Sequence, residues 1–103
     1  MEVLIRVICM GSGSLRERIV NDSKLQKFNL EVTEQKKPGR NPGWAKLHST
    51  ENYGAVNIHW NGPTKTLVCR FVTKRTNKPD NIIGNFLGFL MARYRKRIKA
   101  IVL

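Results

Sequence analysis

Cys9, Cys69, His48 and His59 are the only cysteines and histidines of the chain, and a zinc site or a thiol nucleophile with its base would be built from them. No two of them have the short spacing of a zinc knuckle or a zinc finger. No G-x-S-x-G sequence marks a serine nucleophile, and the seven carboxylates are dispersed along the chain. We therefore expect no metal and no cofactor, and no local motif nominates a catalytic residue.

The segment from Cys9 to Arg16, CMGSGSLR, lies between a predicted strand and a predicted helix. A glycine–serine loop at such a place can present backbone N–H groups to a phosphate. The segment superficially resembles the phosphate-binding loop of low-molecular-weight tyrosine phosphatases. That family needs five residues between the cysteine and the arginine, whereas six separate Cys9 from Arg16. We interpret the segment as a strand-to-helix turn with a buried thiol.

Charge is the strongest functional signal in the sequence. The chain has 19 Lys and Arg against 7 Asp and Glu, a net charge of +12. Residues 1–51 hold nine basic and six acidic residues, whereas residues 52–103 hold ten basic residues and only Asp80 as an acid. This asymmetry favours a polyanionic partner, nucleic acid first and anionic lipid headgroups second. The alternative is a basic face that serves only solubility.

The candidate nucleic-acid-binding residues are cations from the loop after residue 35, the hairpin and the end of the last helix, together with ring side chains able to stack on bases. Trp44 is a further stacking candidate, whereas we expect Trp60 to pack in the core. The full set of candidates is Lys36, Lys37, Arg40, Tyr53, His59, Arg70, Lys74, Arg75, Arg93, Arg95, Lys96, Arg97 and Lys99.

The sequence therefore predicts a small basic nucleic-acid-binding protein with an accessory or regulatory role, RNA ahead of DNA. No ribonucleoprotein motif, GXXG clamp, zinc finger or helix-turn-helix pattern is present. One alternative is a small toxin-like ribonuclease that uses His48, Tyr53, His59 and Arg70. Another is a module for dimerisation, for a protein partner or for a membrane surface. We expect binding rather than catalysis.

Gly84, Gly88 and Ala92 recur every four residues along one flank of the last predicted helix. Each glycine costs a helix about 1 kcal/mol relative to alanine. We expect that cost to be offset by close packing, either against the sheet or against the same helix in a homodimer.

Length and composition predict one domain spanning residues 1–103. Hydrophobic residues make up 41% of the chain, as in ordinary globular proteins. No apolar run reaches the length of a membrane span, and two cysteines do not make a disulfide scaffold. We expect a cytoplasmic protein.

Hydrophobic periodicity predicts the order β-α-β-β-β-β-α-β, an α+β fold with a single, mostly antiparallel sheet and its helices packed on one face. Residues 2–9 are apolar on nearly both faces, which is typical of a strand inside a sheet. Ser12 or Ser14 caps a short helix over residues 15–22. Strands are expected over residues 26–34, 44–48 and 98–103.

A hairpin of residues 53–60 and 65–74 is the best-defined unit. A turn centred on Gly62 and Pro63 would place Ile58 opposite Leu67 and His59 opposite Thr66. The same register sets three more pairs opposite each other: Val56 and Cys69, Tyr53 and Val72, and Glu51 and Lys74.

The last helix is expected to begin at Asp80, whose carboxylate suits the N-cap position. The spacing of its apolar residues predicts a buried face, and that face comprises Ile83, Phe86, Leu87, Leu90 and Tyr94.

Overall fold

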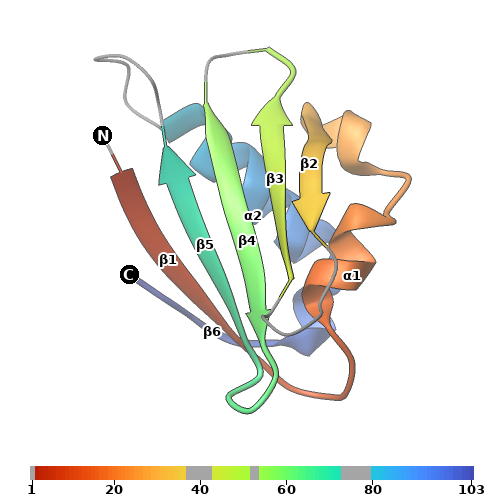
Figure 1. The fold of residues 1–103 in the computed structure, drawn as a ribbon, viewed down its shortest axis with the longest axis vertical. Helices are drawn as coiled ribbons and strands as arrows, with labels where there is room; N and C mark the ends of the chain where they lie inside the picture. The colour runs from red at the N-terminus through yellow and green to blue at the C-terminus, as the bar shows by residue number, and fades with distance from the viewer. Residues whose placement is uncertain (1, 37–42, 52–53, 73–79) are drawn as a thin grey trace.

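The computed structural model describes residues 2–36, 43–51, 54–72 and 80–103, without the side chain of Asp80. These residues form one antiparallel sheet of six strands in the order β2-β3-β4-β5-β1-β6, together with two α-helices and two 3-10 turns (Figure 1). The fold class predicted from the sequence is confirmed. The elements are β1 (Glu2–Cys9), α1 (Leu15–Val20), η1 (Leu25–Phe28), β2 (Leu30–Lys36), β3 (Trp44–Ser49), β4 (Ala55–Asn61), β5 (Thr66–Val72), α2 (Asp80–Tyr94), η2 (Arg95–Arg97) and β6 (Ile98–Val102).

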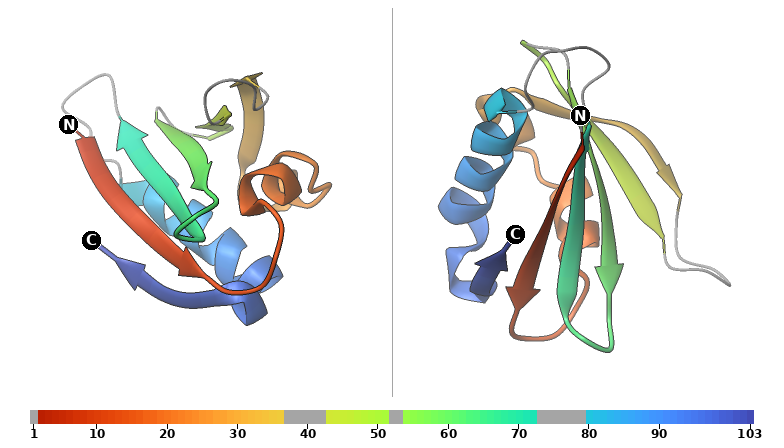
Figure 2. Two further views of the ribbon diagram at one scale, coloured as in Figure 1. Left: turned by 60° about the horizontal axis from the view of Figure 1, so that its bottom comes forward. Right: turned by 90° about the vertical axis from the view of Figure 1, so that its left-hand side faces the viewer.

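The helices cover one face of the sheet and leave the other face open. Alternate residues of each inner strand are buried, such as Val7 on β1, Ile58 on β4 and Phe71 on β5, and they form one core with residues of both helices. Figure 2 (right) shows α2 along one side of the sheet, with no described helix on the other. None of the described helices is long and apolar enough to cross a membrane.

The strand–turn–helix at the N-terminus follows the prediction from the sequence. β1 lies between β5 and β6, inside the sheet as its two apolar faces predict. Gly11 and Gly13 both have positive φ, which turns the chain sharply towards α1. The Ser14 hydroxyl accepts a hydrogen bond from the Glu17 N–H, so Ser14 rather than Ser12 caps the helix.

The register predicted for the hairpin was wrong by two residues. Ile58 lies opposite Cys69 rather than Leu67, and His59 lies opposite Val68. A shift of two residues leaves each side chain on its own face, so the apolar pattern is equally compatible with both registers. The faces were therefore predicted correctly and the partners were not.

The turn between β4 and β5 explains this shift. It contains four residues, Gly62 to Lys65, and the Lys65 N–H donates to the Gly62 carbonyl at 3.2 Å. The predicted loop, residues 61–64, also has four residues. The observed loop starts one residue later, with Asn61 paired in β4 and Lys65 in the turn at a positive φ of 50°. The predicted pairings of Tyr53 and Lys74 lie outside the described residues.

Two further predictions need correction. Residues 25–28 form the turn η1 instead of the start of a strand, because Asn29 takes a left-handed φ of 59° and reverses the chain before β2. In α2, Ile82 and Phe89 are fully buried whereas Ile83 and Leu87 are only partly buried. The buried face of α2 is thus rotated about the helix axis relative to the predicted one. The predicted N-cap at Asp80 is not among the described side chains.

Candidate nucleic-acid interface

The structure divides the predicted binding residues into two sets on different sides of the sheet. Arg93, Arg95, Lys96 and Arg97 lie at the end of α2 and in η2, on the helical side. The second set, on the open face of the sheet, comprises Lys36, His59 and Arg70. Lys99 belongs to neither set and lies on the edge strand β6. The predicted candidates that lie outside the described residues are Lys37, Arg40, Tyr53, Lys74 and Arg75.

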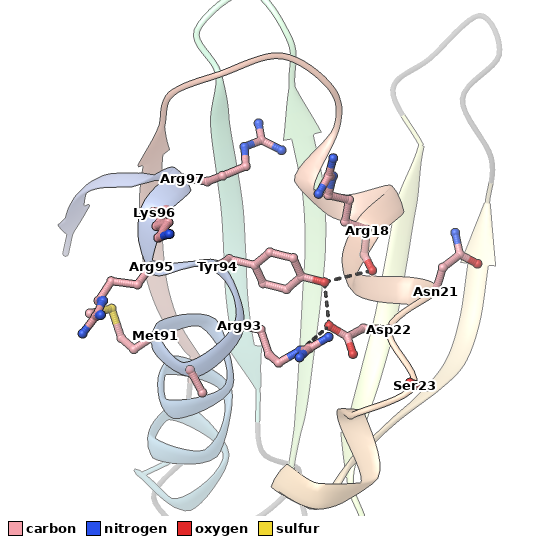
Figure 3. A pocket seen from close by; sticks show the side chains of 11 residues that line it. Arg18, Asn21, Asp22, Ser23, Met91, Arg93, Tyr94, Arg95, Lys96 and Arg97 are labelled. Atoms are coloured by element: carbon pink, nitrogen blue, oxygen red, sulfur yellow. Dashed lines mark hydrogen bonds and ion pairs between the residues drawn. The ribbon is translucent and has the colours of Figure 1, made fainter.

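A cationic hollow lies where the end of α1 meets the end of α2. Its volume is about 830 Å³, and we call it the helix-end pocket. Five cations line it together with one acid, Asp22, and Figure 3 shows them on both sides of the opening. The lining residues are Arg18, Asn21, Asp22, Ser23, Met91, Ala92, Arg93, Tyr94, Arg95, Lys96 and Arg97.

Asp22 joins the two sides of the helix-end pocket. Its side chain is 2% exposed and accepts hydrogen bonds from the Tyr94 hydroxyl at 2.6 Å and from Arg93 Nε at 3.1 Å (Figure 3). The Lys24 N–H donates to its other oxygen at 2.8 Å. Burial raises the pKa of Asp22, but these hydrogen bonds and the Arg93 charge outweigh it, so the pKa lies below its usual value.

Tyr94 is held in its neutral form at the centre of the pocket. Burial and then the hydrogen bond to the Asp22 carboxylate raise the pKa of its hydroxyl. Its ring packs edge-on against Phe89, with ring centroids 5.7 Å apart. Tyr94 therefore supports the pocket with a fixed hydrogen-bond donor and does not add charge to it.

Arg97 fastens the β1–α1 loop as well as lining the pocket. Its Nε donates to the Met10 carbonyl and its Nη2 to the Gly13 carbonyl, each at 3.0 Å. Its guanidinium carbon lies 5.9 Å from the ring centroid of Trp60, which packs against the core as predicted. The Nη1 atom is buried without a hydrogen-bond partner.

Arg18, Arg95 and Lys96 are exposed and make no side-chain ion pair or hydrogen bond among the described residues. Asp22 is already bound to Arg93 and Tyr94, so the lining of the pocket keeps a large excess of positive charge. Guanidinium groups present several donors in a plane that matches phosphate oxygens. The arrangement can therefore bind phosphate groups.

The residues of the α1 end were missed from the sequence. Arg18, Asn21 and Asp22 are seventy or more positions away from Tyr94 and Arg93 along the chain, and only the packing of α1 beside α2 brings them together. One signal was available: Asp22 is one of only seven acids in the chain, so a buried role for it was worth considering.

On the open face, one row of paired residues crosses five strands. Lys36 lies opposite Trp44, Trp44 opposite His59, His59 opposite Val68, and Val68 opposite Arg6. We call these five residues the aromatic row. Trp44 is 37% exposed and His59 is exposed, so both rings face solvent.

The next row on the open face contains an acid as well as two cations. Glu34 lies opposite Lys46, and Lys46, Asn57 and Arg70 lie side by side, followed by Leu4. Arg70 forms an ion pair with Glu2 at 3.2 Å, with both side chains more than half exposed. Its charge is therefore partly balanced within the protein.

The two histidines do not form a catalytic pair. His48 lies opposite Ala55, whereas His59 lies opposite Trp44. The two positions differ by four residues along the strands, or about 13 Å. That distance is too great for acid and base to act on one phosphodiester, so the ribonuclease alternative gains no support from this pair.

The two thiols are buried and free. Burial raises the pKa of Cys9 despite the opposing charge of Arg97, and burial also raises the pKa of Cys69. Both groups are therefore protonated near neutral pH, and Cys9 belongs to a strand-to-helix turn as interpreted from the sequence. Within the described ranges, no group of three His, Cys, Asp or Glu residues could hold a metal ion.

The glycine flank of α2 does not pack on the sheet. Gly84 and Gly88 are exposed, and an added Cβ at either position would have no neighbour within 4 Å. The prediction of close intramolecular packing was therefore wrong, since the flank lies on the outer side of the helix. Its role in a homodimer stays a prediction.

Comparison of the chain with protein-family models, with curated proteins and with solved structures finds no match.

Proposed function

We propose that this protein is a nucleic-acid-binding module, RNA ahead of DNA, that holds phosphates in the helix-end pocket. The observation on which this rests is the gathering of five cations around one hollow whose only acid is already hydrogen-bonded. Phosphate contacts of this kind provide most of the affinity of nucleic-acid binders and release counterions. The module acts by binding, without a catalytic step.

The exposed face of α2 is poorly suited to reading the DNA major groove, which favours RNA as the ligand. Recognition helices present base-contacting side chains on their outer face, whereas α2 presents Gly84 and Gly88 there. RNA is recognised mainly through loops and single strands, which need no inserted helix. A cytoplasmic location is part of the proposal, because Cys9 and Cys69 are free thiols and thiols stay reduced in that compartment.

A charge-neutralising double variant, Arg95→Gln with Lys96→Gln, tests the proposal. Both side chains are exposed and unpaired among the described residues, so the fold should be unaffected. The matched control is Lys27→Gln with Lys65→Gln, which removes the same charge from exposed positions outside the pocket. Fluorescence anisotropy would measure the affinity for labelled single-stranded RNA, single-stranded DNA and duplex DNA over a range of salt concentrations.

The proposal predicts a steep fall of log affinity with log salt for the wild-type protein. For a single strand, the pocket variant should reduce that slope by about 1.4, because each lost phosphate contact contributes about 0.7. The control should change the slope little. Equal losses in both double variants, or no salt-dependent binding at all, would contradict a phosphate site in the pocket.

A further inference from the structure

We propose that the aromatic row on the open face stacks unpaired bases, which makes single-stranded RNA the preferred ligand. This inference rests on the proposed function and adds a second contact surface to it. The two rings, Trp44 and His59, are directly opposite on β3 and β4. Opposed side chains on neighbouring strands have their Cβ atoms about 5 Å apart, so Trp44 and His59 are neighbours on the face.

Exposure of Trp44 on the open face is the first argument. Tryptophan has a large apolar ring, and this one is 37% exposed although the core of the sheet is complete without it. Trp60 shows the contrast, because it points to the helical face and packs against the core and Arg97. The exposed part of the Trp44 ring is suited to stacking on a base.

Cations at both ends of the aromatic row are the second argument. Lys36 on β2 and Arg6 on β1 are separated by four strand spacings, about 19 Å. Both are exposed, and no acid occupies the row between them. Bases stacked on the rings would thus have their flanking phosphates within reach of positive charge at either end.

The shape of the face explains why the ligand is single-stranded. The described part of the open face consists of strands with no helix on it, and a sheet face of this kind does not reach base edges inside a duplex groove. Bases of a duplex are stacked on one another and cannot lie on Trp44. Unpaired bases present free faces to an aromatic side chain, whatever their sequence.

The test compares single-stranded RNA of about 12 nucleotides, within the length range such sites occupy, with the duplex that it forms with its complement. Trp44→Ala should lower the affinity for the single strand between about fivefold and a hundredfold. It should leave the affinity for the duplex unchanged. Trp44→Phe should restore most of the single-strand affinity while removing the part of the ligand-induced quenching of tryptophan fluorescence that arises from Trp44.

Met10→Ala is the matched control, because it removes an exposed apolar side chain (47% exposed) outside the aromatic row. It should change neither affinity. Unchanged single-strand affinity in Trp44→Ala, with binding still reduced by Arg95→Gln and Lys96→Gln, would overturn the stacking surface and leave the proposed function standing. Equal losses for single strand and duplex would also overturn it, and failure of the wild-type protein to bind either RNA would overturn both proposals.

Discussion

Substitution of Asp22 by Asn should weaken the fold and strengthen binding of anions, two effects in opposite directions. The carboxylate accepts side-chain hydrogen bonds from Tyr94 and Arg93 and is nearly buried. Hydrogen bonds to a charged group contribute about 1.5–3 kcal/mol, whereas those between neutral groups contribute about 0.5–1.5 kcal/mol. Asn keeps one acceptor oxygen for Tyr94 and Arg93, but the Tyr94 bond then joins neutral groups and the Lys24 N–H loses its acceptor. Each of these two changes costs about 1 kcal/mol, so the variant loses about 2 kcal/mol.

The pH dependence of stability identifies the charge as the cause. The pKa of Asp22 in the folded protein is lowered, so its stabilisation is present above the unfolded value near 4 and is lost as the pH falls through the folded pKa. Urea unfolding should therefore show a difference of about 2 kcal/mol between the wild type and Asp22→Asn near pH 7. The two curves should converge in acid.

Anion binding should respond in the opposite sense. Removing one negative charge about 6 Å from a bound phosphate changes the interaction by about 0.7 kcal/mol at the dielectric constant of water, or about threefold in affinity. Asp22→Asn should thus bind single-stranded RNA about threefold more tightly, as measured by anisotropy at constant salt. The control Glu51→Gln makes the same change in net charge at an exposed position outside the pocket.

Two results would refute this reasoning. If Asp22→Asn is as stable as the wild type at neutral pH, the hydrogen bonds to its carboxylate do not hold the ends of α1 and α2 together. If Asp22→Asn and Glu51→Gln change RNA affinity equally, net charge rather than the helix-end pocket governs binding.

Three further predictions concern stability and reactivity. Gly84→Ala with Gly88→Ala should raise the free energy of unfolding by about 2 kcal/mol, because helix propensity improves and the new methyl groups meet nothing; urea unfolding measures it. Arg16→Met should keep or raise the melting temperature, since Arg16 is 1% exposed, its Nη1 is buried without a partner, and its ion pair is with Glu17, whose carboxylate is partly exposed and stays hydrated; a lower melting temperature would count against this. Cys9 and Cys69 should react with a colorimetric disulfide reagent only slowly at pH 8, and rapidly after unfolding, because both thiols are buried and their pKa values are raised.

Periodicity predicted most of the fold because each element has a clear inner face. In the hairpin, Val56 and Ile58 were placed correctly on the buried side, whereas their partners were wrong. The partners depend on the positive φ of Lys65 in the turn, and no residue-type preference marks lysine for that conformation. The backbone geometry of the turn therefore sets the register of the hairpin, which the apolar pattern alone does not specify.

The candidate site was predicted only in part, because tertiary packing brings together residues that are far apart in the sequence. The cations at the end of α2 are contiguous in sequence, so Arg95 and Lys96 were found directly. Arg18 and Asp22 come from another segment and join them only through packing. Trp44 was identified as a stacking candidate because of its residue type, but its position opposite His59 follows from the register of β3 and β4.

The strand order has a consequence for how the chain folds. Strands β2 to β5 pair in sequence order, so each of their contacts closes a short loop. β1 instead pairs with β5 and β6, and its first residue, Glu2, lies opposite Val72, 70 positions further along the chain. β1 therefore cannot enter the sheet until β5 is available, and closing so long a loop costs entropy before any contact is gained. We expect the meander of β2 to β5 to assemble first and the entry of β1 to limit the folding rate.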